Sequence, residues 1–406
     1  MKEEKNKFLN PPVKVVIIFG IISLLGDVIY EGARSANSQY FSLLGISAAN
    51  IGFYFGLGEF WGYFLRLFAG LVSDIYHMHW PFIFIGYGFL IVVPLMGTTS
   101  SWGVLASLML LERIGKALRN PSKDTLLSTV SEHEVGIGFA FGIQEALDQL
   151  GAFLGPIIFT LVFYFSGHGL ASYQFAYKLL FIPFILLMVF LYFAYKKIKD
   201  ENLIERIDGK KFSRDKIGKV FWIYCAFSFF SSIGFINFSI IAYHLKVKGL
   251  MTDGNITLLY SLAMIVDAIT ALIIGKAYDI LKIKRKNKMG GILIMALIPF
   301  VTAIIPFFTL SFNKSLIIFG LLIFGLVIGS HETIIRSAIA DITPFSKRGT
   351  AYGIFNGIYG LAFLIGSSLV GALYDFGNMN LIFIFVLAAQ IISLYLFYML
   401  RKNIIK

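Results

Sequence analysis

Long apolar stretches alternate with short polar segments over all 406 residues of the chain. A run of about 20 apolar residues crosses the hydrocarbon core of a bilayer as a helix. The pattern therefore predicts an all-α membrane protein with twelve transmembrane helices. We expect these helices near residues 13–40, 50–73, 80–97, 102–130, 138–166, 171–195, 218–243, 255–279, 289–309, 315–341, 350–375 and 379–400.

Basic residues between the stretches predict the orientation, because lysine and arginine gather in cytoplasmic loops. Residues 196–219 hold nine of them, and residues 282–288 hold five. With an even number of spans, both segments and both termini lie on the cytoplasmic side of the cell (plasma) membrane. The longest polar run is also the expected domain boundary. It separates an N-terminal six-helix bundle (1–195) from a C-terminal six-helix bundle (218–406) through a cytoplasmic linker (196–217).

Composition excludes several classes of protein. Hydrophobic residues make up 57% of the chain and charged residues only 14%, whereas soluble proteins carry about 25% charged residues. The single cysteine, Cys225, excludes an internal disulfide and a cysteine-based metal cluster. The net charge of +12 is confined to a few loops, so we expect no nucleic-acid partner.

Catalytic motifs are not found either. His331 and Glu332 resemble the start of a zinc-protease H-E-x-x-H motif, but Ile335 stands where the second histidine would be. No glycine-rich phosphate loop is present. We therefore expect a monomeric protein that is not an enzyme and has no metal or cofactor. Its expected partners are a small-molecule substrate, protons and the lipid bilayer.

Short motifs recur in the two halves in the same order. A glycine and an aspartate four residues apart end the second and eighth spans, and an arginine and an aspartate five residues apart lie on the fourth and tenth. The repeated positions are Gly70, Asp74, Arg119 and Asp124 in the first half, and Gly275, Asp279, Arg336 and Asp341 in the second. Such agreement indicates two six-helix repeats, which is a known transporter architecture.

With these motifs the chain resembles the major facilitator superfamily. That family carries G-x-x-x-D followed by basic residues between spans 2 and 3, with an echo between spans 8 and 9. The basic part is present only in the second copy, as Lys282, Lys284 and Arg285. The resemblance implies two bundles related by a pseudo-two-fold axis, alternating access, and gating or structural roles for the repeated residues.

The fifth span resembles that of the family's proton antiporters in part. Gly142, Gly151, Gly155 and Pro156 have the signature spacing, while Phe159 and Thr160 replace its final glycine pair. The resemblance implies gating or structural roles for Gly151, Gly155 and Pro156.

Charged residues inside the spans are the main candidates for chemistry. A charge in hydrocarbon is costly, so such groups face a bundle interior or an aqueous cavity. Spacings of three and four place Asp27, Glu31 and Arg34 on one face of the first span, and Glu145 and Asp148 share a face of the fifth. Because burial disfavours the ionised form of a carboxylate, we predict that Asp27, Glu31, Glu145 and Asp148 line the central cavity and that at least one of them carries the coupled proton.

The fourth span carries cations at mid-depth, Arg113 and Lys116, and the tenth span has no matching charges. Fixed cations suit carboxylate or phosphate groups. The alternative is an ion-pair network that only fixes helix packing. His331 is a candidate site residue, but it is equally well explained as an interior histidine whose ring nitrogens are hydrogen-bonded. The full predicted substrate-binding set is Arg34, Glu59, Glu112, Arg113, Lys116, Gln144, Asn237, His331, Glu332, Asn356 and Tyr359.

Two classes of function remain open. The first is secondary active transport of a small polar or anionic organic solute, coupled to protons, with proton/drug antiport as its competitor. The glycines of the fifth span favour antiport, and Arg113 with Lys116 favours symport of an organic anion. The second class is a sensor or lipid scramblase on the same fold. Protonatable residues at the membrane midplane favour transport.

Overall fold

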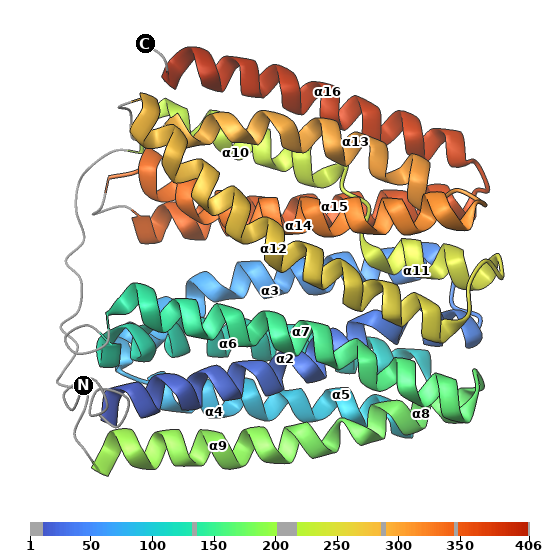
Figure 1. Ribbon diagram of the computed structural model, residues 1–406, viewed down its shortest axis with the longest axis horizontal. Coiled ribbons are helices and arrows are strands. Elements are labelled where there is room, and N and C mark those ends of the chain that lie inside the picture. Colours follow the sequence, from blue (N-terminus) through green and yellow to red (C-terminus); the bar gives the residue numbers. More distant parts are fainter. Residues whose placement is uncertain (1–10, 132–135, 201–216, 286–289, 345–347, 405–406) are drawn as a thin grey trace, which may run out of the picture. The chain divides into compact units, whose positions relative to one another are not determined.

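The computed structural model describes residues 11–131, 136–200, 217–285, 290–344 and 348–404, and all regular structure within these ranges is helical (Figure 1). The helices of the first half are α2 (Pro11–Leu43), α3 (Ala48–Tyr76), α4 (His79–Gly88), η1 (Phe89–Ile91), α5 (Val92–Leu95), η2 (Met96–Thr98), α6 (Trp102–Ser131), α7 (Ile137–Ser166), α8 (Leu170–Leu179) and α9 (Phe181–Asp200). Those of the second half are α10 (Lys219–Ile233), α11 (Phe238–Val247), α12 (Asp253–Arg285), η3 (Gly290–Ala296), α13 (Leu297–Thr309), α14 (Lys314–Ile342), α15 (Arg348–Asp375) and α16 (Met379–Ile404).

These helices confirm the predicted all-α membrane fold and match the twelve expected spans. Four spans are broken into pieces: the third runs from α4 to η2, the sixth is α8 with α9, the seventh is α10 with α11, and the ninth is η3 with α13. Among the described residues, ten segments are long and apolar enough to cross a membrane. The two spans outside that set, α3 and α6, contain the embedded charges Glu59 and Arg113.

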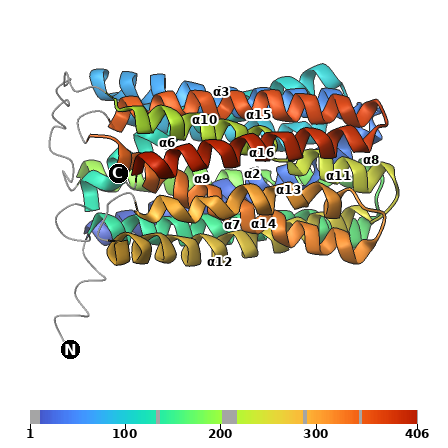
Figure 2. The same cartoon turned by 90° about the horizontal axis from the view of Figure 1, so that it is seen from above.

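The described residues divide into two compact units, one within 11–36 and 65–200 and the other within 37–64 and 217–404. In Figure 1 the long helices of each unit run lengthwise beside one another. The second unit therefore includes the end of α2 and the first half of α3. Within that unit, α12 lies along α14 in both views (Figure 2), and the Thr333 hydroxyl donates to the Ala271 carbonyl, 3.4 Å away.

The start of α3 is fixed to the end of α15 within the second unit. The backbone N–H groups of Ala48 and Ala49 donate to the Asp375 carboxylate, at 3.1 and 2.7 Å. A helix N-terminus leaves such N–H groups unpaired and favours a negative charge. Gly52 then brings the two backbones into contact, because a Cβ there would lie 2.2 Å from the Ser367 carbonyl oxygen. These contacts hold the start of α3 against α15.

A similar close approach joins α2 and α7 in the first unit. A Cβ on Gly155 would lie 2.4 Å from the carbonyl oxygen of Val28, and the facing position on α2 is another glycine, Gly32. Gly151, one turn earlier, faces the Leu24 carbonyl in the same way. Glycine is needed here because any side chain would force the two helices apart.

Gly155→Ala should therefore destabilise the protein by about 1–3 kcal/mol, the usual cost of forcing extra atoms into a packed contact. Gly142→Ala on the same helix is the matched control, since a Cβ at position 142 would meet no atom within 4 Å. Thermal unfolding in detergent should show a lower melting temperature for Gly155→Ala and an unchanged or higher one for Gly142→Ala. Equal melting temperatures would show that the α2–α7 contact is not tight.

Candidate functional site

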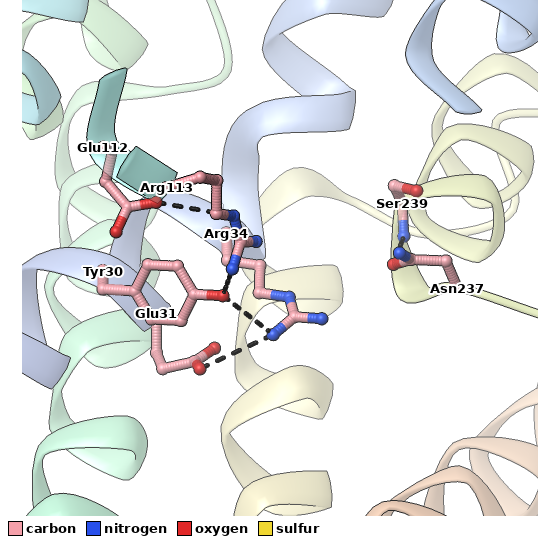
Figure 3. A network of polar contacts seen from close by, with 7 residues as sticks. All are labelled: Tyr30, Glu31, Arg34, Glu112, Arg113, Asn237 and Ser239. Atoms are coloured by element: carbon pink, nitrogen blue, oxygen red, sulfur yellow. Dashed lines mark hydrogen bonds and ion pairs between the residues drawn. The ribbon is translucent and has the colours of Figure 1, made fainter. Parts of the chain in front are cut away.

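Tyr30 of α2 is the centre of a polar network in the first unit. Its hydroxyl oxygen accepts a hydrogen bond from Arg113 Nη1 on α6 and another from Arg34 Nη1, 3.1 Å away (Figure 3). Arg34 follows Tyr30 by four residues, so both side chains leave the same face of α2. The tyrosine hydroxyl thus links two guanidinium groups from different helices.

The aromatic ring of Tyr30 also faces cations. The Arg113 guanidinium carbon lies 4.6 Å from the ring centroid, and the Lys116 Nζ lies 3.8 Å from it. Arg34 is more distant, at 5.8 Å. A cation over an aromatic ring is stabilised by the ring quadrupole, more strongly where water is excluded. Tyr30 therefore holds three cations in place without neutralising them.

Carboxylates of the same two helices balance these cations. Glu31 Oε1 lies 3.7 Å from Arg34 Nη1, and Glu112 Oε2 lies 3.5 Å from Arg113 Nε. Glu112 and Arg113 are only 5% and 6% exposed, which makes this a buried ion pair. The second oxygen of Glu112, Oε1, has no hydrogen-bond partner within the described part of the chain. Such an oxygen can accept a proton or a hydrogen bond from a ligand.

The third carboxylate of the network is Asp27, one turn before Glu31. It lies within electrostatic range of Lys116 and Lys123 on α6 and of Asp148 on α7. The Lys123 ammonium in turn donates to the Ser23 hydroxyl, 2.8 Å away. The structure thus brings charged residues of α2, α6 and α7 together.

The remaining predicted residues of α7 lie at the margin of this network. Glu145 is exposed, and its Oε1 accepts a 3.4 Å hydrogen bond from Gln149 Nε2. Gln144 is buried, and its Oε1 has no hydrogen-bond partner among the described residues.

In the second unit the predicted residues gather among aromatic rings. His331 is buried, lies 6.4 Å from Tyr359 between ring centroids, and its Nε2 has no partner in the described chain. Tyr359 packs edge-on against Tyr63 of α3 at 5.2 Å. Glu59, one turn before Tyr63, is 8% exposed and lies within electrostatic range of Tyr359. This cluster offers hydrogen-bonding groups and apolar walls, with fewer charges than the first unit.

Three further predicted residues belong to the second unit, and one of them, Glu332, also lies within electrostatic range of Tyr359. Asn237 caps α11, because its Oδ1 accepts from the Ser239 N–H at 3.1 Å, and its Nδ2 has no partner among the described residues. Glu332 is exposed, and Asn356 is half-buried.

The predicted structural residues occupy helix contacts and helix ends. Arg119 donates to the Gly86 carbonyl of α4 at 3.2 Å and lies over the Tyr87 ring, so its partners in the described chain are on α4 rather than at Asp124. Asp341 accepts from the Tyr278 hydroxyl and from Lys282 Nζ, each at 2.9 Å. The side chain of Arg336, the other repeated residue of this helix, lies outside the described residues.

The other residues of that set are placed as follows. A Cβ on Gly70 would lie 3.4 Å from Pro121 Cβ, and one on Gly275 would lie 3.3 Å from Thr333 Cγ2. Asp74 and Asp279 are exposed. Pro156 lies inside α7.

Sequence reasoning missed Tyr30, Lys123 and Tyr63. A signal for Tyr30 was available, since it precedes both Glu31 and Arg34 on a helical face already known to carry charges. A signal for Lys123 was available as well, since it follows Lys116 by seven residues and so lies on the same face of the fourth span. Among the described residues, no group of three or more histidine, cysteine, aspartate or glutamate side chains is arranged to hold a metal ion.

Comparison with known proteins identifies the family. Residues 16–335 and 292–404 match the model of the Major Facilitator Superfamily. The chain belongs to this superfamily. An uncharacterised protein of Mycobacterium tuberculosis is 30% identical over 394 residues, which cover 96% of this chain and 93% of that protein. An uncharacterised MFS-type transporter of Methanocaldococcus jannaschii is 27% identical over 373 residues, covering 89% and 88%.

Solved transporters share the fold of this superfamily member at low sequence identity. A mutant form of the nucleoside transporter NupG matches with a TM-score of 0.71 at 13% identity, covering 95% of this chain and 99% of that one. A bacterial homologue of the human lysosomal transporter Spinster, inward-facing and unoccupied, gives 0.69 at 13% identity, with 98% of both chains covered. These matches confirm the two-bundle, twelve-helix fold.

Proposed function

We propose that this secondary transporter moves a small anionic organic solute together with protons. The observation that supports the proposal best is the set of three cations, Arg34, Arg113 and Lys116, gathered around Tyr30. Arginine offers a planar pair of donors that matches a carboxylate or phosphate group. A solute anion would compete with Glu31 and Glu112 for the guanidinium groups that these carboxylates pair with.

Coupling follows from the balance of charge in the same network. When a solute anion takes over the guanidinium of Arg113, the Glu112 carboxylate loses its partner. An unpaired carboxylate in a buried site is costly, so it binds a proton instead. Asp27 and Asp148 extend this exchange through Lys116 and Lys123. Solute and proton would therefore enter the network together and leave it together.

Proton/drug antiport is the second candidate, favoured by the spacing of Gly142, Gly151, Gly155 and Pro156. The contacts of Gly151 and Gly155 with α2 give these glycines a packing role that any coupling mode would need. A sensor or lipid scramblase is the third candidate. Neither alternative function explains why Arg34 and Arg113 both bind the Tyr30 hydroxyl.

The test is proton flux in proteoliposomes that contain a trapped pH-sensitive dye. Dicarboxylates, phosphate esters, neutral sugars and organic cations are added in turn, without an imposed pH gradient. We expect internal acidification with one class of anion only, and none with Arg113→Ala. A response to cations with outward proton movement would favour antiport. If no solute drives proton flux and an imposed pH gradient moves none of them, the transporter proposal is wrong.

We further propose that the functional domains are residues 1–195 and 218–406, joined by a cytoplasmic linker at 196–217. The protein would act as a monomer in the plasma membrane with both termini inside. The basic residues of segments 196–219 and 282–288 support this orientation.

Cysteine labelling tests the orientation. In a Cys225→Ser background, Lys210→Cys should react with a membrane-impermeant maleimide only after the cells are permeabilised. Lys314→Cys, at the exposed start of α14 and on the opposite side, should react in intact cells. Labelling of position 210 in intact cells would reverse the proposed topology.

A further inference from the structure

A groove of about 360 Å³ lies where α2 begins and α9 ends, and its lining shares no residue with the charged network. Its walls are Ile18 of α2 and one face of α9. The α9 residues are Phe190, Phe193, Lys196, Lys197 and Asp200. All of them belong to the first unit.

The order of side chains along α9 is apolar first and charged last. From Phe190 to Lys197 the helix rises about 10 Å, at about 1.5 Å per residue. Phe193 is 53% exposed and Lys196 is also exposed, so the groove opens to the surroundings of the first unit. A membrane lipid has the same order, with an acyl chain followed by a phosphate.

Aromatic residues beside the groove indicate its depth in the membrane. Tyr195 of α9 packs edge-on against Trp80 of α4 at 5.0 Å and against Phe84 at 5.7 Å, and Trp80 stacks on Phe19 of α2 at 6.3 Å. Tryptophan and tyrosine gather at the level of lipid headgroups. Lys196 and Lys197, next in sequence to Tyr195, therefore lie at phosphate level.

We propose that this groove is a binding site for an anionic phospholipid of the phosphatidylglycerol type. The phosphate pairs with the ammonium groups of Lys196 and Lys197, a glycerol hydroxyl donates to Asp200, and one acyl chain covers Phe193 and Ile18. Among the described residues of the lining, two lysines and one aspartate leave a net charge of +1. That charge favours a mono-anionic lipid over a zwitterionic one. The site is independent of the proposed solute network.

Native mass spectrometry of the detergent-purified chain tests the proposal with phosphatidylglycerol, phosphatidylethanolamine and phosphatidylcholine. We expect one tightly bound phosphatidylglycerol, and about tenfold weaker binding by Lys196→Gln/Lys197→Gln. Lys199→Gln is the matched control, because Lys199 lies on the same turn but over the Tyr195 ring, outside the groove. It should bind within about twofold of wild type. Soluble glycerol phosphate should not compete, since it has no acyl chain.

Ile18→Trp supplies a second test that leaves every charge in place. It fills the groove from α2 and should also reduce phosphatidylglycerol binding about tenfold, with an unchanged melting temperature. Equal loss in Lys199→Gln would indicate general attraction to a basic surface and overturn the site. Equal binding of all three lipids, or displacement by glycerol phosphate, would overturn it as well.

Discussion

Asp27→Asn should abolish proton-driven accumulation of solute while solute exchange across the membrane continues. Asparagine keeps the shape of the side chain but cannot take up a proton. Asp27 lies between Lys116, Lys123, Glu31 and Asp148, so a proton bound there changes the balance of the whole network. A pH difference of one unit supplies about 1.4 kcal/mol per proton, enough for about tenfold accumulation in a one-proton, electroneutral symport. In the variant this accumulation should fall to the level of empty vesicles.

The measurement compares uphill uptake with counterflow in the same proteoliposomes. Asp148→Asn and Glu31→Gln should reduce uphill uptake as well, because both carboxylates face cations of α6 or α2. Glu145→Gln should have the smallest effect of the four, since Glu145 is exposed. Full uphill transport in all four variants would falsify proton coupling through this cluster.

The spans could be predicted from sequence because membrane crossing depends on composition over about 20 residues, which is a local property. The broken spans were not predicted. Residues 234–237 between α10 and α11 fall inside one predicted span, 218–243, yet the Asn237 Oδ1 accepts a hydrogen bond from the Ser239 N–H and a new helix starts there. A cap of this kind depends on one side chain, so averaging over a window hides it.

The sequence predicts which helix face each charged residue occupies, but not which residue of another helix it contacts. Arg119 and Asp124 are five residues apart, which is not a helical neighbour spacing. Arg119 accordingly reaches across to Gly86 on α4, a contact made possible by tertiary packing. Tertiary packing also explains why residues 37–64 group with the second half. Their contacts are with Asp375 and Ser367, more than 300 positions further along the chain.

Tyr30 shows why the centre of the site was missed. In sequence it is one of 20 tyrosines, in an apolar span where aromatic residues are common. Its role comes from two cations on α6 that approach its ring and hydroxyl from another helix. Periodicity can place Arg113 and Tyr30 on inward faces, but the pairing depends on how α2 and α6 are aligned. That alignment is a property of the folded bundle.

Arg113→Lys should weaken binding of an anionic solute about tenfold or more while the protein still folds. Lysine keeps the positive charge but loses the planar fork that bonds two oxygens at once. Hydrogen bonds to charged groups contribute about 1.5–3 kcal/mol, which corresponds to roughly ten- to 150-fold in affinity. The change in affinity is measured with the purified protein, as the solute concentration at which the melting temperature rises. Arg401→Lys, exposed near the end of α16, is the matched control and should bind as wild type does.

Arg113→Ala can distinguish a role of Arg113 in solute binding from a role in helix packing only when Glu112 is changed as well. The single variant leaves the buried Glu112 carboxylate without its ion-pair partner, which should cost about 3 kcal/mol or more in stability. Glu112→Gln in the same chain removes that stranded charge and should restore much of the melting temperature. Solute binding should stay lost in the double variant, because no guanidinium remains beside Tyr30 on α6. Recovery of binding together with stability, and unchanged affinity in Arg113→Lys, would assign Arg113 to helix packing and place the solute elsewhere.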